Sequence, residues 1–251
     1  MTELVAMHRD GHVLVITLQR ESKRNAVDRH LADAIDGALN LLDDDEALWA
    51  GVLTGSSTFF SAGSDLTALG DYVTERGGEY GIIRRNRRKP LIAAVEGFAL
   101  GGGMEIVLAC DLVVAASNAR FGLPEVSIGV IPACAGLFRA PQSLPLNLAR
   151  ELILTGVPIT AERAYNAGFV NVLCDPGQAA TEAITLARRI CGNAPLSVQA
   201  CLAAINTRLA TEVIDGWVAT ETAKKAIFGT ADASEGVRSF LEKRAPAWTG
   251  H

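Results

Sequence analysis

The stretch from Lys89 to Gly129 constrains the fold of this chain more than any other part of the sequence. Its first segment, Leu91 to Val95, is a short apolar run that follows a proline, which predicts a buried strand. Three glycines at positions 101 to 103 then precede an apolar segment of helical length, Met104 to Cys110, so we place them in a turn that leads into a helix N-terminus. A turn without Cβ atoms lets a ligand approach the backbone, and its N–H groups can donate to developing negative charge.

Two glutamates accompany these donors. Glu105 stands in the first turn of the predicted helix, and Glu125 follows 20 positions later in the sequence F-G-L-P-E. In isolation each favours a structural role, Glu105 as a partner of the helix dipole and Glu125 as an exposed turn residue. Together with backbone donors, however, two carboxylates are the groups that acid–base chemistry beside a carbonyl requires.

The motifs G-G-G-M-E, A-C-D and F-G-L-P-E, in this order, resemble the enoyl-CoA hydratase/isomerase (crotonase) family, whose members carry G-G-G-x-E and then F-x-x-P-E-x-x-x-G. The resemblance extends to F-F-S-A-G-S-D-L at positions 59–66 and to a terminal S-E-G-V-R-S-F-L-E-K-R-A-P-A-W, so it covers nearly the whole chain. It implies an α/β fold, a spiral of ββα units in residues 1–191 that carries the acyl-CoA site. Residues 192–251 would form a C-terminal helical region for oligomerisation. From the pattern alone, an α/β barrel is the alternative.

The resemblance also implies the residues of the site. Glu105 would activate a water molecule and Glu125 would deliver a proton to the α-carbon, while the N–H groups of Ser64 and Gly102 would form the oxyanion hole. Coenzyme A would be bound by residues that follow the family motifs, namely Lys23, Asn25, Ala26, Ala62, Asp65, Leu66 and, from a neighbouring protomer, Lys243. For Asn25 the structural interpretation is a strand-to-helix turn, which can hold together with coenzyme A binding, and for Lys243 a solvated helix end is the alternative.

These groups favour an enoyl-CoA hydratase acting on an acyl-CoA thioester, with no permanently bound cofactor, no metal, and coenzyme A as part of the substrate. Two alternatives stay open. The first is another crotonase activity, an enoyl-CoA isomerase or a hydroxyacyl-CoA dehydratase, and the second is a non-catalytic acyl-CoA binder. A hydrolase is disfavoured because no G-x-S-x-G occurs and the four histidines fall outside every motif. We expect a homotrimer or a dimer of trimers.

The remaining chain predicts ordinary elements. A hairpin is expected over Leu4 to Leu18, a helix with Asp28 as its N-cap, and a strand over Trp49 to Thr54. From Pro176 onward the pattern is helical, with helices predicted over 178–190, 195–210, 212–227 and 233–241. The basic run 84–89 allows two interpretations, a solvated helix face or a cradle for the phosphates of coenzyme A.

One loop departs from the family. Where the family commonly has I-P-G-A-G-G before an arginine, this chain reads I-P-A-C-A-G-L-F-R at positions 131–139. The departure places Cys134 near the predicted site. Because no histidine stands nearby to act as a base, we interpret this cysteine as a packing residue.

Composition limits the partners further. The net charge of −5 argues against nucleic acid or an acidic membrane, so an anionic ligand needs local cations. Five cysteines without a C-x-x-C pair predict reduced thiols in a cytoplasmic protein. The N-terminus lacks a signal-peptide pattern, and residues 91–116 contain too many charges and glycines for a membrane span.

Overall fold

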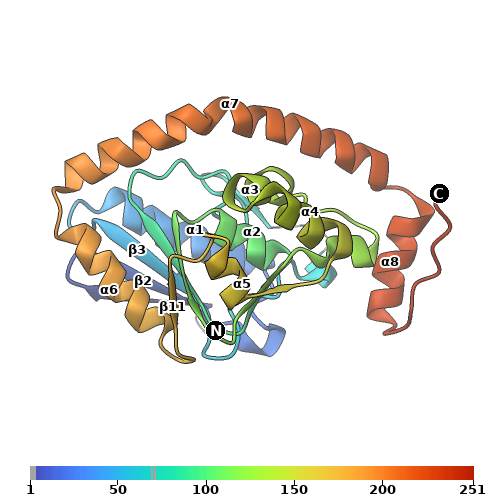
Figure 1. The fold of residues 1–251 in the computed structure, drawn as a ribbon, viewed down its shortest axis with the longest axis horizontal. Coiled ribbons are helices and arrows are strands. Elements are labelled where there is room, and N and C mark those ends of the chain that lie inside the picture. The colour runs from blue at the N-terminus through green and yellow to red at the C-terminus, as the bar shows by residue number, and fades with distance from the viewer. Residues whose placement is uncertain (1–3, 69, 71) are drawn as a thin grey trace.

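A computed structural model describes residues 4–68, 70 and 72–251 of the chain. Residues 1–3, which belong to the N-terminus without a signal pattern, lie outside the described part, as do positions 69 and 71. The central sheet has the strand order β1-β2-β3-β6-β8-β11 (Figure 1). These strands span Val5–Asp10, Val13–Leu18, Ala50–Thr54, Leu91–Val95, Leu112–Ala116 and Val172–Cys174. The predicted hairpin is confirmed, because β1 and β2 pair antiparallel, and the other neighbours pair parallel.

Both faces of this sheet are covered, which explains why its inner strands are apolar throughout. On one face lies α1 (Arg29–Asp44), whose buried residues include the predicted Leu31, Ile35 and Leu39, and Asp28 caps it by accepting from the N–H of Leu31. On the other face lies α6 (Ala179–Cys191), whose small buried alanines approach alternate residues of β2, β3 and β6. The period of two along each strand thus divides the core into two layers.

A second, smaller sheet positions the glycine turn. It has the order β10-β9-β7, with strands Ile159–Thr160, Arg120–Gly122 and Phe98–Leu100. The helix α2 (Gly102–Leu108) begins directly after β7, and the 3-10 helix η3 (Pro124–Ile128) begins directly after β9. Because β7 and β9 pair in parallel, the starts of α2 and η3 leave the same end of this sheet. The shorter elements are η1 Glu21–Lys23, η2 Leu66–Ala68, β4 Val73–Thr74, β5 Gly78–Glu79, α3 Gly136–Ser143, α4 Leu146–Thr155 and α5 Ala161–Asn166.

The C-terminal region differs from the prediction in one respect. The two helices expected over 195–210 and 212–227 are a single helix, α7 (Pro195–Ile227), which arches over the rest of the molecule (Figure 1). No proline or glycine stands at the expected break, and Gly216 within the helix is required for packing, because a Cβ there would lie 2.4 Å from the Phe138 ring. The last helix, α8 (Ala231–Leu241), packs on η3 through Gly236, whose Cβ would meet the Ile128 carbonyl.

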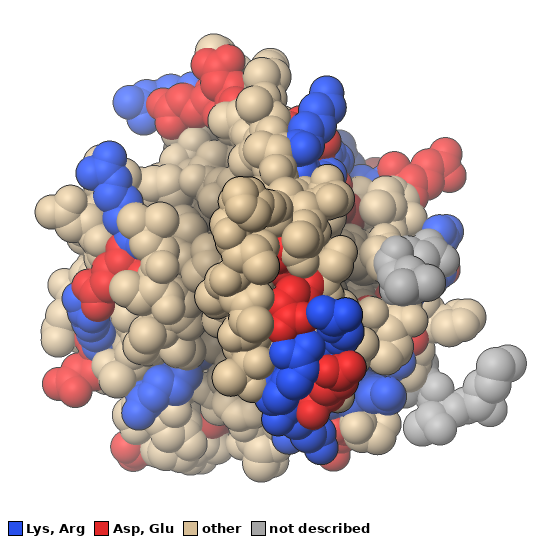
Figure 2. Space-filling model, turned by 90° about the vertical axis from the view of Figure 1, so that its right-hand side faces the viewer, with Lys and Arg blue, Asp and Glu red and all other residues tan. Residues whose placement is uncertain are grey.

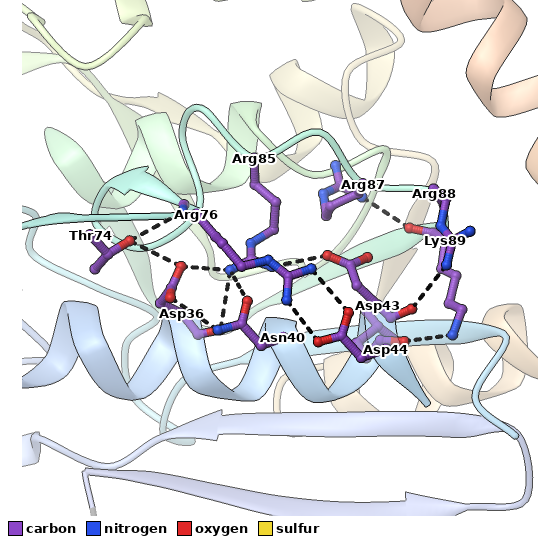
Figure 3. Close-up of polar contacts among 12 residues, drawn as sticks. Asp36, Asn40, Asp43, Asp44, Thr74, Arg76, Arg85, Arg87, Arg88 and Lys89 are labelled. Atoms are coloured by element: carbon purple, nitrogen blue, oxygen red, sulfur yellow. Dashed lines mark hydrogen bonds and ion pairs between the residues drawn. The ribbon is translucent and has the colours of Figure 1, made fainter. Parts of the chain in front are cut away.

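The basic run 84–89 fits neither predicted interpretation at three of its positions. The Arg85 guanidinium is buried and pairs with Asp36 at 2.6 Å and Asp43 at 2.9 Å, both on α1 (Figure 3). Arg87 pairs with Asp111, and the Lys89 ammonium donates to the Leu42 and Asp45 carbonyls. These side chains therefore join the loop to the core and are neither a solvated face nor free to bind phosphate.

None of the helices in the described ranges combines the length and apolar character that crossing a bilayer requires.

Candidate active site

The segments 24–27 and 62–63 lie side by side just before the N-terminus of α1. The N–H of Ala62 donates to the Arg24 carbonyl at 3.0 Å, and the N–H of Val27 donates to the Gly63 carbonyl at 2.7 Å. Asn25 is fully buried between them, where its side-chain amide donates to the Phe60 carbonyl at 2.9 Å. The structural interpretation of the Asn25 side chain is therefore confirmed, since its groups are used within the chain.

The same loop touches the glycine turn. Gly63 has φ +91, a conformation that favours glycine, and a Cβ there would lie 2.7 Å from the Gly102 nitrogen. The following residue, Ser64, and Gly102 thus come together from loops almost forty positions apart. Within the described residues, neither of their backbone N–H groups donates a hydrogen bond. Two unused donors at one point are what an oxyanion hole requires.

Glu105 lies in the first turn of α2 and is buried. Its Oε1 atom accepts two backbone hydrogen bonds, from the N–H of Cys134 at 2.7 Å and of Gly136 at 2.8 Å. Burial raises the pKa of Glu105 to about 7, and the two N–H donors oppose that shift by stabilising the carboxylate. The loop that departs from the family motif therefore holds the predicted base.

The residue between these two donors adopts an unusual backbone. Ala135 has φ +81, in the left-handed region where the family motif has glycine. This conformation turns the N–H groups on either side of Ala135 toward the same carboxylate oxygen. Backbone strain at a site is maintained only where the surroundings fix it, and here the Glu105 carboxylate provides two of those restraints.

Glu125 approaches the glycine turn from the other side. It lies in η3, and a Cβ on Gly101 would be 3.4 Å from its Oε1 atom. Its Oε2 atom is enclosed and has no hydrogen-bond partner in the described structure. Burial, and then the charge of Glu105, raise the pKa of Glu125 to about 8. Both pKa values are raised, so the pair retains protons toward neutral pH, and the shift is larger at Glu125.

The residues predicted to bind coenzyme A fall into two groups. The segments 23–26 and 62–66 lie side by side next to the glycine turn, joined by the hydrogen bonds described above. Within them Lys23 is exposed, whereas Asp65 is buried and pairs with Arg20 at 2.8 Å. Lys243 stands beyond the end of α8, exposed and with φ +54. On the end of the molecule that carries α8, side chains of both charges lie beside one another, without a broad basic field (Figure 2).

Sequence reasoning missed the tyrosine beside the oxyanion hole. The Tyr80 hydroxyl lies 2.7 Å from the Ser64 hydroxyl, and a Cβ on Gly102 would be 2.5 Å from it. Tyr80 follows the two-residue strand β5 in the segment 72–81, where no periodic pattern indicates which side chain points inward. The glycines at 77, 78 and 81 are the only local signal of a tight turn there.

Comparisons with known proteins agree with this geometry. A model of the enoyl-CoA hydratase/isomerase family matches residues 8–251. A carnitinyl-CoA dehydratase of Salmonella arizonae is 36% identical over all of both chains, and a short-chain-enoyl-CoA hydratase of Clostridium acetobutylicum is 34% identical over 96% of this chain and 95% of its own. The crystal structure of a carnitinyl-CoA hydratase from Mycobacterium avium superposes with a TM-score of 0.91 at 39% identity, with all of both chains covered.

Proposed function

The chain belongs to the enoyl-CoA hydratase/isomerase family and has its crotonase fold, and from this premise we propose that it is an enoyl-CoA hydratase. The enzyme adds water across a trans-2-enoyl-CoA thioester to give a 3-hydroxyacyl-CoA. One observation carries the proposal, which is the pair of buried, coupled carboxyls Glu105 and Glu125 beside two unused backbone N–H groups. A non-catalytic acyl-CoA binder has no need of such a pair.

The two carboxyls differ in the hydrogen bonds that they accept, and this difference assigns each of them one proton transfer. Glu105 accepts two backbone hydrogen bonds, which favour its ionised form, and so it takes a proton from the attacking water as the new C–O bond forms at the β-carbon. Glu125 has an enclosed Oε2 atom without a hydrogen-bond partner among the described residues and holds its proton more tightly, and so it delivers that proton to the α-carbon. Between these steps the thioester oxygen carries negative charge.

That negative charge would be stabilised by the N–H groups of Ser64 and Gly102. Removal of one such donor costs about 3 kcal/mol of transition-state stabilisation in an acyl-transfer enzyme that has an oxyanion hole. Because Gly63 and Gly102 are in contact, the two donors are held at one point before the substrate binds. The donors therefore need no reorganisation during the reaction.

A second candidate activity is dehydration of a 3-hydroxyacyl-CoA, the reverse of the same reaction. It is favoured by the carnitinyl-CoA dehydratase of Salmonella arizonae, which is as similar to this chain as the hydratases are. The same carboxyls serve in reverse, because Glu125 takes the α-proton and Glu105 returns a proton to the leaving hydroxyl.

The direct test is a panel of trans-2-enoyl-CoA thioesters of graded chain length, followed by the loss of enoyl absorbance. We expect hydration of at least one member at a rate typical of enzymes, roughly 1 to 10³ per second. Parallel assays with 3-enoyl-CoA and with 3-hydroxyacyl-CoA distinguish an isomerase and a dehydratase. No turnover on any of these thioesters, with coenzyme A binding intact, would leave only the acyl-CoA binder.

We further propose that the C-terminal helices join protomers in a trimer or a dimer of trimers. In support, α7 exposes Ile205, Ile214 and Val218, although most helices of a single globular chain bury such residues. A groove of about 550 Å³ beside the end of α7, lined in part by Ile227 and Trp248, adds to this apolar surface. The double variant Ile214→Glu, Val218→Glu should therefore lower the mass measured by light scattering to that of one chain.

Coenzyme A binding by segments 23–26 and 62–66, and by Lys243 of a neighbouring protomer, is part of the same proposal. An exposed ammonium on a long stem suits a phosphate, and a chain of net charge −5 needs such local cations. Lys243→Ala should weaken coenzyme A binding, while Lys225→Ala, a matched loss of charge on α7, should not. Equal affinity in the two variants would contradict the role of Lys243. The predicted cytoplasmic location rests on the five free thiols.

A further inference from the structure

Tyr80 is held in a conformation that tyrosine rarely adopts. Its backbone φ is +56, in the left-handed region, and its side chain is 2% exposed. For a bulky residue this backbone is strained and persists only where the surrounding structure fixes it. Strain of this kind is concentrated at functional sites.

Several contacts fix this backbone. The N–H of Tyr80 donates to the Tyr72 carbonyl at 2.8 Å, and the two tyrosine rings lie 4.6 Å apart. The next residue, Gly81, packs so closely on α1 that a Cβ would be 2.4 Å from the Ala32 carbonyl oxygen. Four residues later, Arg85 joins the segment to two carboxylates of α1 (Figure 3). The left-handed turn is therefore built in by the hairpin, the helix and a buried ion pair together.

The result is that one hydroxyl contacts both halves of the oxyanion hole. It hydrogen-bonds the Ser64 hydroxyl at 2.7 Å and lies directly against the Gly102 backbone. Burial, and then the nearby Cys134 thiol, raise the pKa of Tyr80, and the backbone N–H of Cys134 donates to Glu105. Tyr80 thus stands between the two loops that supply the N–H donors and the loop that holds the base.

We propose that Tyr80 is a positioning residue of the oxyanion hole, whose hydroxyl holds Ser64 and Gly102 at the separation that lets both N–H groups donate to one thioester oxygen. The inference rests on the proposed function, because it assigns the two donors to a thioester. Ser64 and Gly102 come from separate loops, and the strength of a hydrogen bond falls steeply as its distance and angle depart from the optimum. A hydroxyl bonded to one loop and packed on the other fixes that geometry.

The test compares Tyr80→Phe, Ser64→Ala and the double variant with the wild-type protein and with Tyr165→Phe, which removes an exposed hydroxyl on α5. Infrared difference spectra of bound butanoyl-CoA, labelled with ¹³C at the thioester carbonyl, measure how strongly the oxyanion hole polarises that bond. Hydration of trans-2-butenoyl-CoA gives kcat and KM for the same proteins. Butanoyl-CoA has no double bond and does not react, so the spectrum reports geometry alone.

We expect the wild-type protein to shift the carbonyl band to lower frequency, and Tyr80→Phe to lose part of that shift. We expect kcat to fall about tenfold with KM almost unchanged, the size of one net hydrogen bond. Ser64→Ala should reproduce the effect, and the double variant should be no worse than the worse single variant, because both changes break the same bond. Tyr165→Phe should match the wild-type protein.

Three outcomes would overturn the inference. A wild-type downshift that Tyr80→Phe leaves unchanged removes the positioning role while leaving the proposed function intact. Losses that multiply in the double variant would mean that the two hydroxyls act separately. A wild-type protein that binds butanoyl-CoA without any downshift contradicts the proposed oxyanion hole and this inference together. If Tyr80→Phe does not fold, Ser64→Ala alone still decides, because the loss of its hydroxyl must weaken the carbonyl shift.

Discussion

Replacement of Glu125 by glutamine should remove a loss of stability that the wild-type protein suffers as pH rises to neutral, while strongly lowering kcat. In the folded protein, burial and the nearby Glu105 raise the pKa of the Glu125 carboxyl to about 8, from 4.5 in a solvated chain. The folded state therefore binds this proton more tightly than the unfolded state does. For a carboxyl whose pKa is raised, stability is full below the unfolded pKa and is lost as pH rises from about 4.5 toward about 8.

The magnitude follows from the shift. Each unit of pH between the unfolded and folded pKa values costs about 1.4 kcal/mol, so between pH 5 and pH 7 the wild-type protein loses roughly 3 kcal/mol through Glu125. Glutamine cannot ionise, so the variant is spared this loss of stability as pH rises. The difference in the free energy of unfolding between Glu125→Gln and wild type should therefore grow by about 3 kcal/mol in favour of the variant over this range.

Urea unfolding of both proteins at pH 5 and pH 7, at one protein concentration, measures this difference. Only its change with pH matters, because a buried amide adds a cost of its own that does not depend on pH. Glu151→Gln is the control of opposite sign, since its ion pair with Arg163 lowers the pKa of that carboxyl and removal should cost stability at the higher pH. If the free energies of unfolding of Glu125→Gln and wild type differ by the same amount at both pH values, the Glu125 carboxyl is not buried and protonated as described.

Two other predictions concern packing. Gly102→Ala should abolish hydration, because its Cβ would lie 2.5 Å from the Tyr80 hydroxyl, whereas Gly37→Ala, which meets nothing within 4 Å on α1, should leave activity unchanged and stabilise the fold by about 0.5–1 kcal/mol. An active Gly102→Ala enzyme would contradict the geometry of the glycine turn. Arg85→Met should lower the free energy of unfolding by about 3–5 kcal/mol, because it leaves the buried Asp43 carboxylate without its cation. Arg163→Met, at an exposed pair, should change it little, and equal effects in urea unfolding would show that burial does not matter.

Motifs with local causes could be predicted from the sequence. The strand 91–95, the cap at Asp28 and the glycine turn all follow from residues adjacent in the chain, and the structure confirms them. The helix begins earlier than predicted, because two of the three glycines lie inside α2 and only Gly101 precedes it. The proximity of Gly63 to Gly102 was accessible only through the family resemblance, because it joins two distant loops.

What the sequence could not reveal depends on tertiary partners. The residues of the run 84–89 are adjacent in the chain but lie in an irregular segment, so Arg85 and Arg87 reach carboxylates on different elements, which no charge pattern identifies. Tyr80 depends on a left-handed backbone that only its surroundings stabilise. The continuity of α7 was obscured because its apolar residues lie on several faces and form no single stripe along the helix.

The central claim is that Glu105 and Glu125 act together to add water to an enoyl thioester, and single glutamine variants test it most directly. Hydration of trans-2-butenoyl-CoA, or of the best member of the chain-length panel, is followed by enoyl absorbance for wild type, Glu105→Gln and Glu125→Gln, with butanoyl-CoA affinity measured by calorimetry. Each variant should lower kcat by about 10² to 10⁴ while butanoyl-CoA affinity stays within about twofold of wild type. Hydration by either variant at close to the wild-type rate would contradict the account.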